Sequence, residues 1–461
     1  MTTRGPTNRA VARVGSGRIG TFWLAGAAGL LLLGFAQFSC RRPSPEVVTL
    51  TFLDPERLYD LGQRQLITDT ALKDFTRETG IQVNHLPTPE TNTGQLALAR
   101  KLLGEGTATV DVYGFDTIWS GMLSDYVVDL KPYFSAALPS QDPEVLANFL
   151  FQGKLVAMPY HENVGVLYYR TDLLHRYGYT APPKTWDELE KMALRIQTGE
   201  RARGDKDFWG YVWPGTDGEG LTCQGVEWQV DEGGGSIVEP DKRISVNNPG
   251  AIRAWERARH WVGWISPPTV VSYEEWDASN SFWVAGRAAF MRGWADYFLG
   301  HPPDVPFRDQ AGVTSLPGGK VARVAALGGS GLAVSRSSAH RAEAIRLVEF
   351  LTRREAQIQA VHAHMRPAGG PEPHELPAIL VRDYPQLARP GEIAGGNEVS
   401  RPSLVTGPKY DDVDQAYLRA LHSVLTGKSR AQEAAAALEK ELVRITGFAA
   451  EKKETKLPGN N

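Results

Sequence analysis

The stretch "VVTLTFL" (Val47–Leu53) opens the alternating pattern that decides the fold class. Its β-branched and apolar residues are typical of a buried strand. Apolar residues at helical spacing follow, and Gly80 marks the end of that helix. The segments "IQVNHL" (81–86), "GQLALARKLLGEG" (94–106) and "TVDVYGFD" (109–116) then predict a strand, a helix and a strand. This alternation predicts an α/β fold with a mainly parallel sheet and helices on both faces.

The carboxyl end of the third predicted strand is the first candidate for a binding site. Open α/β sheets bind ligands beyond the carboxyl ends of their strands. Asp116 closes this strand, and Trp119 follows three residues later. The alternative for Asp116 is a residue that caps a helix or a loop. Further on, "GKLVAMPYHENVGVLYYRTDLL" (153–174) predicts a crossing into a second lobe, and Thr185 with Glu188 predicts a capped helix.

The first forty residues are typical of a processing segment. Several arginines precede an apolar run from Ile19 to Phe38, and Cys40 follows it. This order resembles a bacterial lipoprotein signal, in which the Cys carries the lipid, although that signal prefers Leu and a small residue where Gln37 and Phe38 stand. The alternative is a retained membrane helix, for which about 20 residues suffice. Either way we expect an exported protein that is anchored to the membrane and faces the periplasm or the cell exterior.

The composition argues against several functions. The 461 residues carry a net charge of -3, which is no electrostatic footprint for nucleic acid. Cys40 and Cys223 are the only cysteines, so lipidation of Cys40 leaves no pair for an internal disulfide. The spacing of His362, His364 and His374 does not match that of zinc sites. We therefore expect no metal and no cofactor.

A series of segments then points to one family. They are "DVYGFDTIW", "GVLYYRTDLLHRYGYTAPPKTWDEL", "IQTGER", "FWGYVW", "EGLTCQGVEW", "GGGS", "GRAAFMRGW", "LGGSGLAVS" and "SRPS". Together they resemble the sugar-binding lipoproteins of ABC importers (extracellular solute-binding family 1), most closely the trehalose/maltose-binding branch. The resemblance implies a two-lobe periplasmic-binding-protein fold of the maltose-binding-protein type, with a flanked, mainly parallel sheet in each lobe and a hinge between them. It also implies a binding protein rather than an enzyme, ABC permease subunits as partners, and a monomer.

The same resemblance divides the chain into parts. Residues 1–40 are the signal or lipoprotein anchor segment, and 41–46 are a tether. The N-terminal lobe is formed by 47–165 and 325–372, and the C-terminal lobe by 166–324 and 373–447. Residues 448–461 are expected to be a disordered tail.

The ligand site also follows from the resemblance. In this branch an aromatic ring after "GRAAF" meets the sugar, and Trp294 holds that place. A flat ring suits the C–H face of a pyranose, whereas the sugar's hydroxyls, which cost about 1–3 kcal/mol each if buried unpaired, require polar partners. By position, those partners are Asp116, Asn163, Glu275 and Arg401. Further candidates are Trp119, Trp213, Trp276, His161, Gly329 and Ser330.

Each candidate has an ordinary alternative. Trp294 has the alternative of a core residue, Asn163 of a turn residue, Glu275 of a solvated helix face and Arg401 of a surface ion pair. Trp276 and Trp213 are the weaker aromatic candidates.

Several positions depart from the trehalose/maltose branch. Asn163 stands for an Asp, His161 for a Tyr and Ser330 for an aromatic residue, and Gln95 or Gly94 stands where an Arg is expected. The ligand is therefore expected to be a carbohydrate, a disaccharide such as trehalose or maltose, with its exact identity open.

Two rival functions stay open at this point. One is a lipoprotein for a non-sugar solute, such as a peptide or a polyol phosphate. The other is a glycoside hydrolase, in which Asp116 and Glu275 would be the paired carboxylates that this chemistry needs. No eightfold strand–helix pattern of a barrel supports the hydrolase.

Overall fold

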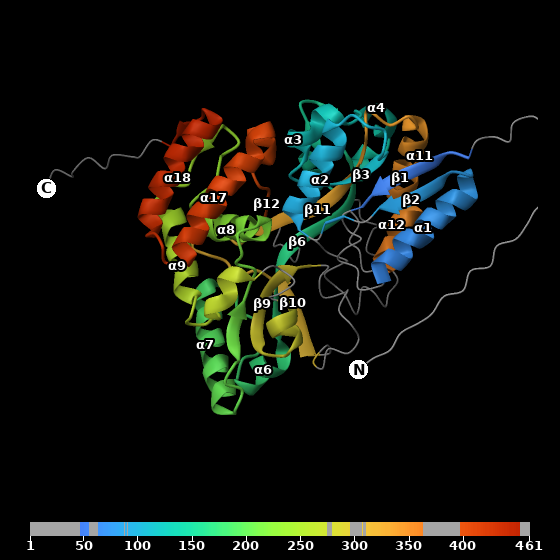
Figure 1. Cartoon of the computed structure of the whole chain (residues 1–461). Helices are drawn as coiled ribbons and strands as arrows, with labels where there is room; N and C mark the ends of the chain where they lie inside the picture. The colour runs from blue at the N-terminus through green and yellow to red at the C-terminus, as the bar shows by residue number, and fades with distance from the viewer. Residues whose placement is uncertain are drawn as a thin grey trace, which may run out of the picture. The chain divides into compact units, whose positions relative to one another are not determined.

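The computed structural model describes residues 47–54, 63–86, 88–89, 91–273, 279–295, 307, 310–362 and 397–451 (Figure 1). The first half of this chain forms β1 (Thr49–Leu53), α1 (Gln63–Thr79), β2 (Gln82–Leu86), α2 (Asn92–Gly104), β3 (Val112–Asp116), α3 (Ser120–Leu123), α4 (Lys131–Phe134), α5 (Pro143–Phe149), β4 (Leu150–Phe151), β5 (Lys154–Leu155) and β6 (Met158–Arg170).

The second half continues the alternation of helices and strands. It forms α6 (Thr171–Arg176), α7 (Trp186–Ala202), β7 (Trp209–Val212), α8 (Glu219–Asp231), β8 (Arg243–Ile244), α9 (Pro249–Trp261), a π-helical segment (Ser279–Val284), β9 (Ala288–Trp294), β10 (Ala311–Ser315), β11 (Ala325–Val334), α11 (Arg341–Thr352), α12 (Arg354–His362), β12 (Glu398–Val399), α16 (Ser403–Thr406), α17 (Tyr410–Leu425), α18 (Ala431–Thr446) and β13 (Ala449–Ala450). Short 3-10 turns lie at Ser124–Tyr126, Leu138–Ser140, Pro268–Ser272 and Gly407–Lys409.

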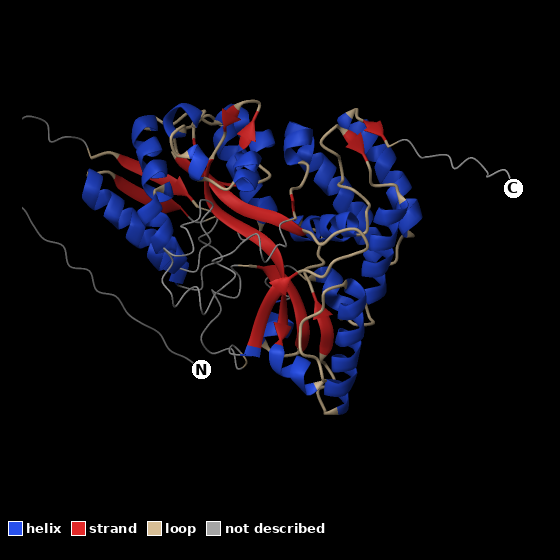
Figure 2. Cartoon of the chain, turned by 180° about the vertical axis from the view of Figure 1, so that it is seen from behind, coloured by secondary structure: helices blue, strands red, loops and turns tan. Residues whose placement is uncertain are grey.

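One mixed sheet joins two groups of strands in the order β2-β1-β3-β11-β6-β9-β7. β1 pairs in parallel with β2 and β3, and β7 pairs in parallel with β9, as strand–helix alternation predicts. β11 and β6 lie between these groups, and the pairings of β3 with β11, β11 with β6 and β6 with β9 are antiparallel. Figure 2 shows these two strands running from one group to the other. The sheet is therefore parallel towards both ends and antiparallel in the middle.

β6 takes part in both groups of strands because it is 13 residues long. Its first part pairs with β11, where Ser330 lies opposite His161. From Gly165 onward it pairs with β9, where Gly165 lies opposite Trp294. The crossing that the sequence predicts within 153–174 is formed by this strand.

α8 is buried along most of its length, although it carries many polar side chains. Its buried polar residues are Thr222, Gln224, Glu227, Gln229 and Asp231. α9 and α17 pack against it. Gly225 permits the close approach of α17, because a Cβ there would lie 2.6 Å from the Leu421 side chain. Buried polar groups need hydrogen-bond partners, and the partners of α8 lie on α7, β9, β11, α17 and the loops before and after α8.

Candidate functional site

The carboxyl ends of β3 and β9 reach the two central strands from opposite sides. β3 ends at Asp116, opposite Ser330 of β11. β9 ends at Trp294, opposite Gly165 of β6. The Trp294 ring also borders β11, because a Cβ on Gly328 would lie 2.9 Å from its Cζ3 atom. We call this region, where ligands of open α/β sheets are expected, the crossing site; its residues are Asp116, Asn163, Trp294, Gly328, Gly329, Ser330 and Arg401.

Trp294 is half-buried and held from several directions. The guanidinium carbon of Arg292 lies 4.2 Å from the centroid of its ring. The Tyr168 hydroxyl donates a hydrogen bond to the Trp294 carbonyl oxygen. The ring edge contacts Gly328, where any side chain would displace it. Trp294 is therefore neither fully buried nor loosely held.

Arg292 and Glu227 form an ion pair beneath this ring. Arg292 Nη2 lies 2.8 Å from Glu227 Oε1, and the two side chains are 0% and 1% exposed. Glu227 Oε1 also accepts a hydrogen bond from the backbone N–H of Ala326 at 2.9 Å. Gly165 leaves room for the pair, since a Cβ there would lie 2.3 Å from that carboxylate oxygen. The pair joins α8, β9 and β11.

Asp116 is the most accessible charged group of the crossing site, with its side chain 23% exposed. Its Oδ2 accepts a hydrogen bond from Asn92 Nδ2 at 2.8 Å. Its Oδ1 accepts from the backbone N–H of Ile118 at 3.1 Å and lies 3.3 Å from Arg401 Nη2. Asp116 therefore does what the alternative prediction says, because its carboxylate accepts a hydrogen bond within the turn after β3. Part of the carboxylate is nevertheless exposed to solvent.

Arg401 lies deeper than the sequence suggests, with its side chain 3% exposed. Nη1 donates to Cys223 Sγ at 3.0 Å and to the Leu327 carbonyl at 3.1 Å. Nη2 donates to Thr117 Oγ1 at 3.0 Å and to Asp116, and Nε lies 3.1 Å from Glu219 Oε1. The alternative of a surface ion pair is excluded, because this buried guanidinium connects β3, β11 and α8.

A second carboxyl group stands behind Glu219. Tyr410 donates a hydrogen bond to Glu219 at 3.0 Å, and Thr222 donates one to Asp414 at 2.5 Å. Burial raises the pKa of Glu219 well above its ordinary value, the charge of Asp414 raises it further, and Arg401 opposes both. Burial likewise raises the pKa of Asp414 to about 6, against the hydrogen bonds from Thr222 and with Glu219. The cluster therefore contains three carboxyl groups, those of Asp116, Glu219 and Asp414, near the one guanidinium of Arg401.

The other predicted residues on the central strands are brought together by the β6–β11 pairing. Asn163 is half-buried, lies opposite Gly328, and accepts the Val164 N–H at 3.0 Å. His161 and Ser330 are paired across the strands and are only 2% and 3% exposed. Gly329 has φ +123°, and a Cβ there would lie 2.2 Å from the His161 carbonyl oxygen, so this position favours glycine.

Two of the tryptophan candidates lie in the core. Trp213 is 0% exposed, packs edge-on against Trp228 at 5.3 Å between ring centroids, and donates to Ser266 at 3.0 Å. Trp119 is 2% exposed and packs against Phe115 at 5.8 Å. Their burial favours a packing role. Residue type alone could not distinguish these buried tryptophans from the half-buried Trp294 in the sequence.

The remaining predictions concern Gln95 and residues outside the part of the chain that the structure describes. Gln95 is buried, and its Nε2 donates to the Pro89 carbonyl at 3.0 Å. Glu275, Trp276, Cys40, His364 and His374 lie outside the residues that the structure describes, as does the side chain of His362. Within the described ranges no group of three or more potential metal ligands occurs. Nor does any helix in those ranges have the length and apolar character to cross a membrane.

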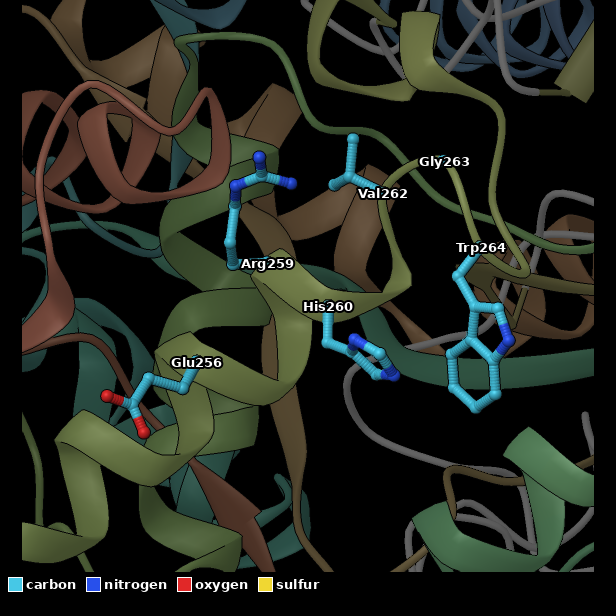
Figure 3. A pocket seen from close by; sticks show the side chains of 6 residues that line it. All are labelled: Glu256, Arg259, His260, Val262, Gly263 and Trp264. Carbon is cyan, nitrogen blue, oxygen red and sulfur yellow. The ribbon is translucent and has the colours of Figure 1, made fainter.

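A surface hollow lies at the C-terminal end of α9 (Figure 3), lined by Glu256, Arg259, His260, Val262, Gly263 and Trp264. The rings of His260 and Trp264 are 4.4 Å apart there. None of the predicted ligand residues lines this hollow. It is therefore distinct from the crossing site.

Sequence reasoning missed Glu227, Arg292 and Glu219, which support the crossing site from behind. One signal was present: Arg292 is a charged residue inside an apolar strand, two residues before Trp294, and so on the same face. The carboxylates of "EGLTCQGVEW" gave no such signal, since a buried helix with acidic residues looks like a surface helix until its partners are known.

This fold and this site define a class of protein: a two-lobe α/β binding protein whose candidate site lies where strands of both lobes meet the strands that join them. Residues 63–358 match the family of bacterial extracellular solute-binding proteins, and the chain belongs to that family. It is the substrate-binding protein of an ABC transporter and has no enzymatic role.

Known relatives agree with this assignment. A probable ABC transporter-binding protein of Deinococcus radiodurans is 41% identical over 382 residues, which is 81% of this chain and 89% of the relative. The structure of maltose-bound T. maritima MalE3 has a TM-score of 0.77 and 27% identity, and covers 87% of this chain and 100% of that one. A solute-binding protein from Thermotoga lettingae bound with α-D-tagatose has a TM-score of 0.71 and 20% identity, over 87% and 100% of the two chains. The fold is that of the maltose-binding proteins.

Proposed function

We propose that the crossing site binds a carbohydrate, specifically a disaccharide such as trehalose or maltose, for delivery to the permease of the ABC transporter. The observation that carries this proposal is the half-buried ring of Trp294 at the carboxyl end of β9, supported from one side by Arg292. A ring held in this way offers a flat apolar surface to the C–H face of a pyranose. The maltose that is bound in T. maritima MalE3 supports the same ligand class.

The polar partners in this proposal are Asp116 and Asn163, because both are part-exposed at the crossing site. Arg401 is buried and orients Asp116 from behind. Glu275 and Trp276, which lie outside the described residues, are proposed as partners on the remaining side. Carboxylate and amide groups make strong hydrogen bonds to hydroxyls that would otherwise be buried unpaired.

Delivery in this proposal depends on movement of the two lobes. We assign residues 47–165 with 325–372 to the N-terminal lobe and 166–324 with 373–447 to the C-terminal lobe. Ligand binding would shift the population towards a closed form, with β6 and β11 as the hinge. A monomer held at the membrane by a lipid on Cys40, after cleavage of the first 39 residues, completes the proposal.

The test is a titration of the purified chain and of Trp294→Ala with maltose and trehalose. An aromatic residue at the centre of a binding site typically contributes at least about 2 kcal/mol, so we expect a loss of affinity of about 30-fold or more. Trp209→Ala is a matched control. Trp209 is also half-buried, has Arg201 4.2 Å from its ring centroid, and lies opposite Ala288 at the far end of β9.

Two results would contradict the proposal. A parent chain that is stabilised against heat by a peptide or by glycerophosphate, and by no sugar, would assign the site to another solute class. A Trp294→Ala variant that melts far below the parent, while Trp209→Ala does not, would make Trp294 a core residue. A saturating sugar at about 100 times its Kd should stabilise the parent by about 2.7 kcal/mol, which a thermal shift detects readily.

A further inference from the structure

The ring of Trp294 rests on an arginine that solvent does not reach. Arg292 is 0% exposed at its side chain, and its guanidinium carbon lies 4.2 Å from the ring centroid. The two residues are two positions apart on β9 and therefore share a face of the strand. A guanidinium over the face of an indole is attracted by the ring's quadrupole, and more strongly when water is excluded.

The position of Arg292 is in turn fixed by Glu227. The 2.8 Å ion pair anchors the guanidinium to α8. The same carboxylate oxygen accepts the Ala326 N–H of β11 at 2.9 Å, so Glu227 is anchored as well. Gly165, directly opposite Trp294, has no side chain that would occupy the space of the carboxylate. Three elements thus determine where the ring lies.

A buried ion pair is a poor means of stabilising a fold. Removing two charges from water costs about as much as their attraction returns, and apolar replacements of similar volume are often neutral or stabilising. The Glu227–Arg292 pair therefore calls for a reason other than stability. Its contact with the one half-buried tryptophan of the crossing site supplies that reason.

We propose that Glu227 and Arg292 are positioning residues that hold the Trp294 ring in its ligand-binding orientation before the ligand arrives. This inference rests on the proposed function of the crossing site. A side chain that is already ordered loses less conformational freedom on binding, and this raises affinity without any additional contact to the ligand. Arg292 and Glu227 act through Trp294 and do not touch the sugar.

The experiment uses a double substitution that removes both charges together, Glu227→Gln with Arg292→Met, because removing one partner of a buried ion pair is strongly destabilising by itself. The chain offers a matched control pair. Arg170 and Asp172 form a 2.7 Å ion pair, with Arg170 4.4 Å from the ring centroid of Phe307 at the other end of β6. Arg170→Met with Asp172→Asn removes an ion pair that also has an arginine beside an aromatic ring but is less buried, with side chains 12% and 19% exposed.

Maltose is the probe, and its Kd is measured by calorimetry for the purified parent and for each variant. We expect the Glu227/Arg292 double variant to melt close to the parent and to bind maltose about three- to ten-fold more weakly, the range expected for ordering one large side chain. The control pair should leave the Kd unchanged. In a Trp294→Ala background, the same double substitution should cause no further loss, since the residue through which the pair acts is absent.

Three outcomes would overturn the inference: an unchanged Kd in the double variant, an equal loss in the control pair, or the same fold-loss with and without Trp294.

If the parent chain does not bind maltose, the proposed ligand fails, and a second measurement then decides the positioning role. The near-ultraviolet circular dichroism of Trp294, taken as the difference between parent and Trp294→Ala, should change in the double variant and not in the control pair. An unchanged difference spectrum would reject the positioning role without reference to any ligand.

Discussion

Arg292 and Arg401 are both buried arginines paired with carboxylates of the same helix, α8, and yet their surroundings differ. Arg292 pairs with Glu227 at 2.8 Å, and neither side chain is more than 1% exposed. Arg401 lies near Glu219 and Asp116, and Asp414 stands behind Glu219. Arg292 contacts the Trp294 ring, whereas Arg401 joins the acidic groups at the end of β3 and on α8.

The two arginine sites should differ in how their contribution to stability depends on pH. The guanidinium of Arg292 keeps its proton under all ordinary conditions. A cluster with excess acid responds to pH and to the loss of its cation by binding protons. We therefore expect the two sites to react differently to the same kind of change.

The largest effect is expected from Glu227→Ala. It removes the carboxylate that lies 2.8 Å from the buried Arg292 guanidinium. Breaking a buried ion pair by removing one partner typically costs about 3–5 kcal/mol of unfolding free energy. Denaturant unfolding at pH 5 and pH 8 should give the same loss at both values, since arginine cannot release its proton. The prediction is contradicted if Glu227→Ala loses no more unfolding free energy than the Glu227→Gln/Arg292→Met double variant.

Arg401→Met should destabilise the protein less, by about 2–3 kcal/mol at pH 8, through the loss of the compensating charge. At pH 5 the loss should be smaller, because Glu219 and Asp414 can take up protons once the guanidinium is gone. The same unfolding measurements check this. An equal loss at both pH values would remove the distinction between the two arginine sites.

Asp414 should make the unmodified protein less stable as the pH rises. Its folded pKa of about 6 lies above the ordinary value of 3.8, so the folded state binds this proton more tightly than the unfolded state does. The stabilisation is complete below about pH 4 and is lost as the pH rises through 6, by on the order of 3 kcal/mol. Asp414→Asn, which keeps an acceptor for Thr222, should flatten this part of the stability profile, and an unaltered slope in the variant would assign the titration to another group.

The smallest effect is expected from Ser330→Ala. Ser330 is 3% exposed, and its hydroxyl has no hydrogen-bond partner among the described residues. Removing a buried unpaired hydroxyl should change the unfolding free energy by less than about 0.5 kcal/mol or stabilise slightly. If Ser330 binds the ligand, the sugar affinity falls while stability holds, and calorimetry with maltose distinguishes the two cases.

Local features of the fold were predictable from the sequence. Asp116 was found because a predicted strand ends there, and strand ends follow from nearby apolar runs and turns. Trp294 was found through the family resemblance carried by "GRAAFMRGW". The helix cap at Thr185 was equally local: its hydroxyl accepts the Glu188 N–H at 3.2 Å, as the four-residue pattern predicts. These signals lie within a few residues of the feature that they predict.

The charge network could not be predicted in this way. Glu227 and Arg292 are 65 residues apart, and Arg401 is 178 residues from Cys223 and 285 from Asp116. Nothing in a single sequence specifies such partners, so Arg401 was assigned to the ligand while its contacts to the protein stayed hidden. Trp213 was a candidate because a tryptophan ring suits a sugar. Its contacts to Trp228 and Ser266, which bury it, could not be seen in the sequence.

The burial of α8 depends on residues that are synthesised much later. Tyr410 and Asp414, which bind Glu219 and Thr222, follow them by 191 and 192 residues. A nascent chain that has not reached Tyr410 leaves this face of α8 uncovered. Long-range contacts of this kind require both partners to be present, so the part of the molecule around α8 can complete its folding only after Tyr410 and Asp414 have been synthesised.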